Sequence, residues 1–109
     1  MKTIPLIRKE LKELRYYSMY RKDIDNALDF CPKHEVVDLL QTYNRAIEFA
    51  PIQLYHIYYK LYIKCHTQES LANDLKLTPE YIYRLHAKLI QFFYSIFNFE
   101  CKHNVELNE

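Results

Sequence analysis

Polar and basic side chains recur at helical spacing between positions 80 and 91 of this chain. Residues three and four apart share one face of a helix, so this spacing places Arg84, Ala87 and Lys88 close together. An arginine can bind the edge of guanine in the major groove of DNA, and a small alanine allows the backbone to come close. A lysine one turn further along is suited to a phosphate. The alternative is an ordinary solvent-exposed face, which every amphipathic surface helix carries.

The residues before this segment predict a shorter helix that would position it. Thr67 is a preferred N-cap residue, and we expect the helix itself to cover residues 68–75. After a three-residue turn, Thr78 and Pro79 supply a side-chain cap and a preset φ for the next helix. A helix, a short turn and a second helix form the arrangement of a DNA-reading helix-turn-helix. The inward-facing residues of the shorter helix are expected to be Leu71, Ala72 and Leu75.

The turn at residues 76–78 is expected to bury Leu77 as a plug between the two helices. Lys76 stands at the usual left-handed position, which a residue other than glycine adopts only at some energetic cost. The helix that follows should present an inner apolar stripe of Ile82, Leu85, Leu89, Phe92 or Phe93, and Ile96. Opposite this stripe lie Glu80, Tyr83, Arg84, Ala87 and Gln91.

Composition favours a single all-α domain, a small helical bundle. The chain has 109 residues, half of them apolar, and contains no glycine. Without glycine, hairpins with primed turns, phosphate-binding loops and dinucleotide fingerprints are disfavoured. We expect helices in residues 1–50 that brace the molecule or join two copies of it. A helix-turn-helix unit should follow at residues 51–97, and a frayed polar tail at residues 98–109.

Three supporting helices are expected before the helix-turn-helix, each with apolar residues at helical spacing. Pro5 opens the first, the second covers about residues 34–49, and Pro51 opens the third. The predicted inner stripes are Ile7, Leu11 and Leu14 in the first helix, Val36, Leu40, Tyr43 and Ile47 in the second, and Leu54, Ile57, Leu61 and Cys65 in the third.

A cluster of tyrosines in the third supporting helix has two readings. Aromatic rings can stack on nucleic-acid bases, but such stacking is mainly a property of single-strand binding. We therefore favour packing in the core or at a subunit interface, where rings with one polar end are common. The tyrosines concerned are Tyr55, Tyr58, Tyr59 and Tyr62.

Charge is unevenly distributed along the chain, although the formal net charge is only +1. Residues 1–22 hold seven basic and two acidic side chains, residues 23–50 hold two and six, and residues 51–109 hold six of each. Nonspecific attraction to phosphates should therefore be weak, unless the basic N-terminal helix lies beside the groove or a dimer doubles the basic surface.

Enzymatic, metal-binding and membrane functions are not expected. Three cysteines do not make a disulfide framework, which favours a reducing cytoplasm. Cys31 and His34 have a ligand-like spacing, and Cys65-His66 and Cys101-x-His103 add candidates, but there is no second matching pair for zinc. No nucleophile, paired-acid or nucleotide motif indicates an enzyme, and no segment has the length of a signal peptide core or a membrane span.

From about residue 53 to residue 93 the sequence resembles region 4 of the sigma-70 factors. It is more similar to the ArpU and RinA-like group of small phage and prophage regulators of Gram-positive bacteria. The string Tyr81-Ile-Tyr-Arg-Leu-His-Ala-Lys-Leu89 resembles their recognition helix, and Ser70-Leu-Ala-Asn-Asp-Leu75 resembles the helix before it. The usual glycine of the family's turn is Lys76 here. Nothing in the N-terminal half resembles the parts of a sigma factor that bind core polymerase or melt DNA, which excludes a complete initiation factor.

The resemblance implies a transcriptional regulator of phage or mobile-element genes that reads double-stranded DNA at a promoter or operator without a cofactor. Arg84 and Lys88 match the family's contact positions, and His86, Tyr81 and Tyr83 correspond by position. His86 lies near the apolar stripe, so a partly buried imidazole is favoured over a base contact there. A homodimer would supply two reading helices for a palindromic site. The expected DNA-binding residues are Thr67, Gln68, Thr78, Glu80, Tyr81, Tyr83, Arg84, His86, Ala87 and Lys88.

Two alternatives remain open from the sequence. The first is a protein-interaction module that acts on RNA polymerase or a sigma factor through its tyrosine-rich helices without reading DNA, which the near-neutral charge favours. The second is a DNA-packaging recognition subunit, similar to the small terminase subunits, which would form a ring-sized oligomer.

Overall fold

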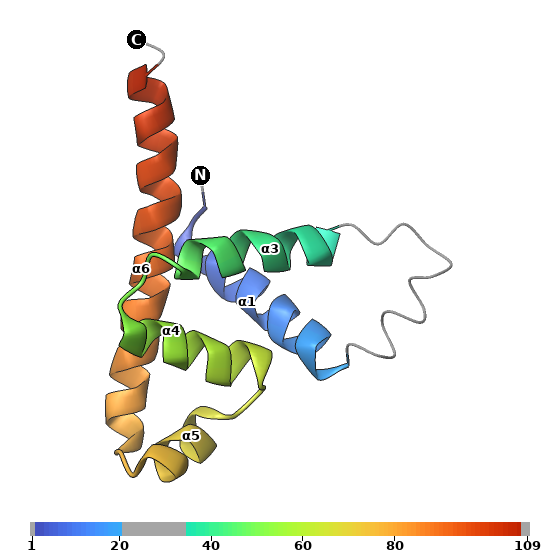
Figure 1. The fold of residues 1–109 in the computed structure, drawn as a ribbon, viewed down its shortest axis with the longest axis vertical. Helices are drawn as coiled ribbons and strands as arrows, with labels where there is room; N and C mark the ends of the chain where they lie inside the picture. Colours follow the sequence, from blue (N-terminus) through green and yellow to red (C-terminus); the bar gives the residue numbers. More distant parts are fainter. Residues whose placement is uncertain (1, 21–34, 108–109) are drawn as a thin grey trace.

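The computed structural model of the chain describes residues 2–20 and 35–107, with side chains described as far as residue 99. In these ranges the chain is all-helical, as predicted, and contains no strand. The longest helix, α6 (Pro79–Leu107), packs against α1, α3, α4 and α5 (Figure 1). It continues to Leu107, although the apolar sequence pattern fades after Asn98.

Of the first two helices in the described ranges, the first begins close to the predicted start at Pro5, and the second begins and ends close to the predicted residues 34–49. In α1 (Ile4–Met19), Thr3 is the N-cap, and its side-chain oxygen accepts a hydrogen bond from the backbone N–H of Leu6 at 3.3 Å. The predicted stripe of α1 is buried, with Ile7, Leu11 and Leu14 each at 0% exposure. In α3 (Glu35–Ile47), Tyr43 and Ile47 are buried and Val36 and Leu40 half-buried. The predicted stripe therefore faces inward.

The third supporting segment departs from a regular α-helix. It begins as α4 (Ile52–Tyr58) after Pro51 and continues as a π-helical turn, η1 (Tyr59–Ile63). A π-helical turn contains one more residue than an α-helical turn, which changes the faces that follow it. Tyr58 and Tyr62 are buried, whereas Tyr55 and Tyr59 are exposed, so only half of the tyrosine cluster packs in the core.

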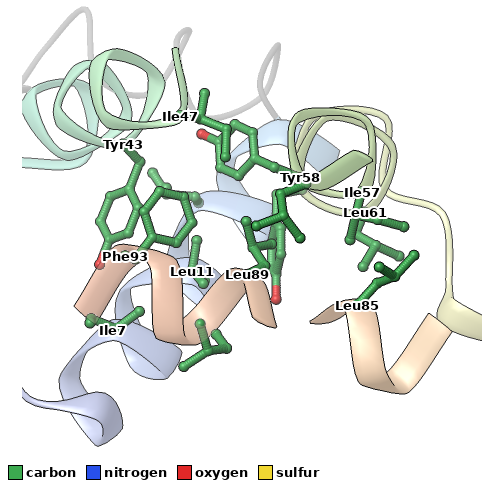
Figure 2. Packing of buried hydrophobic residues seen from close by; sticks show 14 of the residues in the cluster. Ile7, Leu11, Tyr43, Ile47, Ile57, Tyr58, Leu61, Leu85, Leu89 and Phe93 are labelled. Carbon is green, nitrogen blue, oxygen red and sulfur yellow. The ribbon is translucent and has the colours of Figure 1, made fainter. Parts of the chain in front are cut away.

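The core lies between α6 and the supporting elements, and Figure 2 shows its aromatic centre. The rings of Tyr43 and Phe93 meet edge to face with centroids 4.8 Å apart, and Tyr58 packs edge-on against Phe93 at 5.7 Å. Both buried hydroxyls donate hydrogen bonds: Tyr43 to a carboxylate oxygen of Glu10 at 2.8 Å, and Tyr58 to the amide oxygen of Asn44 at 2.7 Å. Burying these rings therefore leaves neither hydroxyl unsatisfied.

Two predictions about the short helix at residues 68–75 and the turn after it are wrong. Leu75 and Leu77 were expected to be buried, but they are 49% and 40% exposed. The short helix α5 (Gln68–Leu75) packs on α6 and η1 at the end of the molecule, and only Leu71 and Ala72 reach the interface. Its last turn therefore extends past the elements that could cover Leu75 and Leu77.

Candidate nucleic-acid interface

The helix α5 and the turn after it are held by the local interactions that the sequence predicts. The Thr67 side chain accepts a hydrogen bond from the backbone N–H of Ser70 at 3.0 Å, and so caps α5. At the other end, Lys76 has φ 57° and ψ 40°, the left-handed conformation. The backbone N–H groups of Leu77 and Lys76 donate to the carbonyls of Ala72 and Asn73, the bonds of a Schellman motif.

The start of α6 is also capped as predicted. The side-chain oxygen of Thr78 accepts a hydrogen bond from the backbone N–H of Tyr81 at 3.2 Å, and Pro79 is the first helical residue. Ile82, Leu85 and Leu89 form the buried stripe of this helix, which packs against α1, α3, α4 and α5. This packing fixes the rotation of α6 about its axis.

The opposite face of α6 is exposed along its first three turns. Glu80, Arg84, Ala87, Lys88 and Gln91 are all exposed. Their positions around the helix place a guanidinium, an ammonium and a small side chain on one surface. Such a surface can form hydrogen bonds and ion pairs with an anionic partner.

His86 lies at the border of this face and is engaged inside the protein. Its Nε2 is hydrogen-bonded to the hydroxyl of Tyr62 in η1, and the two rings are stacked with centroids 6.0 Å apart. Burial lowers the pKa of His86, and the nearby positive charge of Arg8 lowers it further. Burial raises the pKa of Tyr62 to about 12, against the opposing effect of Arg15 and Arg8. At neutral pH, the neutral imidazole of His86 is therefore hydrogen-bonded to the neutral phenol of Tyr62 at this edge of the core.

The basic N-terminal helix α1 packs against η1 and α6. The guanidinium of Arg15 donates a hydrogen bond to the carbonyl of Cys65 at 3.1 Å, just before α5. Lys12, one turn earlier, and Arg8, two turns earlier, border a concavity of about 490 Å³ between α1 and α6. The other residues that line it are Tyr62, Gln68, Tyr83, His86 and Ala87.

Most of the sequence-predicted site residues lie on the surface, and two residues of the N-terminal helix, whose basic side chains were expected to approach phosphates, are added to them by position. Exposed members are Thr67, Thr78, Glu80, Tyr81, Tyr83, Arg84, Ala87 and Lys88, whereas Gln68 and His86 are half-buried. The two added residues are Arg8 and Lys12, for which the only signal in the sequence was the concentration of basic residues before position 23.

The part of the chain that the structure describes was searched for metal-ligand clusters and for membrane-spanning helices. Across residues 2–20 and 35–99, no group of three His, Cys, Asp or Glu side chains could hold a metal ion. Cys31 and His34 lie outside the described residues, and Cys65 instead places its thiol 3.5 Å from the backbone carbonyl of Arg15. Within the ranges searched, each helix is too short or too polar to cross a bilayer.

Comparisons with protein-family models, with curated proteins and with solved structures gave no match for this chain.

Proposed function

We propose that this chain binds double-stranded DNA through the exposed face of α6 and acts as a transcriptional regulator. The observation that supports this function best is the exposure of Arg84, Ala87 and Lys88 on a helix whose other side is locked into the core. The capped helix α5 and its left-handed turn hold the start of α6 at the end of the molecule (Figure 1). A helix held in this way can enter a major groove without other elements moving.

Within this interface, the residues would have different roles. Arg84 would bind a guanine edge, which is worth about 1–3 kcal/mol of discrimination between bases. Lys88 and the N-terminal end of α5 after Thr67 would bind phosphates and set the position of the protein on the duplex. His86 would stay with Tyr62 and contribute to the shape of the interface, because its Nε2 is already hydrogen-bonded.

The direct test is DNA binding measured by fluorescence anisotropy. The probes are duplexes from the sequence flanking the gene and a random duplex of equal length. We expect the chain to prefer one flanking site, and Arg84→Ala to lose about 1–3 kcal/mol of that preference. Arg45→Ala removes an exposed arginine from α3 and is the matched control. This variant should keep the preference for the flanking site. Absence of binding to any duplex at low salt would refute the proposed function.

A role in phage or mobile-element transcription rests on the resemblance to sigma region 4-like regulators described above. Homodimerisation belongs to the same proposal, because two copies would present two reading helices to a palindromic site. Light scattering of the free protein tests it: a dimer is expected. A large ring would instead favour recognition of DNA for packaging.

Exposed apolar side chains favour a second candidate, a protein-interaction module that contacts RNA polymerase or a sigma factor. Phe49 and Ile52 are 74% and 67% exposed at the corner between α3 and α4. Large exposed apolar residues that lie close together often mark protein-binding surfaces. Loss of polymerase binding in Phe49→Ser, with no DNA binding by the wild-type protein, would favour this function over the first.

A further inference from the structure

We infer that Arg8 and Lys12 of α1 form a second anchor for the phosphate backbone of duplex DNA, beside the groove-facing surface of α6. This inference rests on the proposed DNA binding, and it assigns a place in the complex to a helix outside the helix-turn-helix. It begins with the orientation of α1. Ile7, Leu11 and Leu14 are fully buried, so the helix cannot rotate, and Arg8 and Lys12 are held at the surface one turn apart.

The concavity between α1 and α6 brings these two cations next to the proposed reading face. Arg8 and Lys12 line it from one side, and Tyr83 and Ala87 from the other. Ala87 lies on the face that carries Arg84 and Lys88. A duplex that accepts α6 in its major groove has a phosphate strand along each side of that helix. The strand on the α1 side would pass Arg8 and Lys12.

Charge distinguishes this concavity from the other surface that the two residues border. The groove of about 1190 Å³ between α1 and α3 is also lined by Arg8 and Lys12, but its walls include four acidic residues, Glu10, Glu13, Glu35 and Asp38. The described residues that line the concavity beside α6 include no acidic side chain. Of the two surfaces compared, and among the described residues that line them, a phosphate therefore meets uncompensated positive charge on the side of α6.

The position of Arg8 can be checked without DNA. Its positive charge contributes to the lowered pKa of His86 on α6, so Arg8→Gln should raise that pKa. Proton NMR titration of the imidazole measures the shift, and Lys9→Gln is the matched control. Lys9 follows Arg8 on the same helix but lines the groove between α1 and α3 and not the concavity beside α6. An unchanged His86 pKa in Arg8→Gln would contradict this placement.

The decisive experiment is the salt dependence of DNA affinity, measured by anisotropy with a flanking-site duplex and a random duplex. Each phosphate contact contributes about 0.9 to the slope of log affinity against log salt. The double variant with Arg8→Gln and Lys12→Gln should therefore lose about 1.8 from the slope and weaken both duplexes by the same factor. Lys9→Gln should leave the slope unchanged.

The possible outcomes separate the two proposals. If wild-type protein binds neither duplex, the proposed function and the α1 anchor are both refuted. If the protein binds and Arg84→Ala reduces sequence preference, but the double variant keeps the wild-type slope, only the α1 anchor is refuted. A reduced slope with an unchanged preference for the flanking site supports the anchor, because phosphate contacts carry no sequence information. Circular dichroism of each variant verifies that the exposed substitutions leave the helices intact.

Discussion

Replacing Lys76 with glycine should stabilise the protein. Lys76 closes α5 in the left-handed conformation, with φ 57° and ψ 40°. For an L-residue other than glycine, this conformation costs about 1–2 kcal/mol, because Cβ lies too close to the following carbonyl oxygen. Glycine removes that clash but makes the unfolded chain more flexible, which costs about 0.4–1 kcal/mol. We therefore expect Lys76→Gly to raise the free energy of unfolding by about 0.5–1 kcal/mol.

Urea and thermal unfolding followed by circular dichroism measure this change, and Tm should rise by roughly 2–6 °C for a domain of this size. Lys76→Ala is the essential control, because it removes the same charge from the end of α5 but keeps Cβ. The alanine variant should be no more stable than wild type, so the difference between the two variants isolates the backbone conformation. A glycine variant that is no more stable than the alanine variant would refute the reasoning, since the turn would then carry no relievable strain.

Three further substitutions test the core and the border of the site. Phe93→Ala removes a ring with 0% exposure from the aromatic centre of the core and leaves a cavity there. It should lower the free energy of unfolding, measured in urea, by about 3–5 kcal/mol. Tyr43→Phe removes the hydrogen bond to the Glu10 carboxylate and should lower it by about 1–2 kcal/mol; an unchanged midpoint would contradict this role for the hydroxyl. His86 has a pKa below its ordinary 6.5 in the folded protein, so the unfolded chain binds the proton more readily. Stability should therefore fall as pH drops from 6.5 towards the folded pKa, and His86→Gln should lose less Tm than wild type between neutral pH and about pH 5.

The sequence contains enough local information to predict where α5 and α6 begin. Thr67 and Thr78 each provide a cap whose hydrogen bond comes from the residue three positions further along the chain, so both helix starts could be placed. The stripe from Ile82 to Leu89 repeats every three or four residues, which determines the inner face of α6. The left-handed conformation of Lys76 could be predicted because the motif needs it whichever residue stands there.

Features that depend on tertiary packing were not predictable in this way. Leu75 and Leu77 have the apolar character of buried residues, but nothing local shows that α5 ends beyond the elements that could cover them. The π-helical turn that brings Tyr62 to His86 has no distinctive sequence signal. The approach of α1 to the flank of α6 joins segments far apart in the chain. Basic composition alone could not indicate which side of α1 faces the site.

The long helix α6 has one face in the core and one face in solvent, and this limits how far the helix can move when a ligand binds. One face contributes Ile82, Leu89 and Phe93 to a core shared with α1, α3 and α4, while the other is open to solvent. Shifting or turning the helix to suit a partner would break the close-packed contacts that its inner side makes from Ile82 to Phe93. Recognition on the outer face should therefore proceed by docking of a preformed surface, with adjustment left to side-chain rotamers and to the shape of the partner.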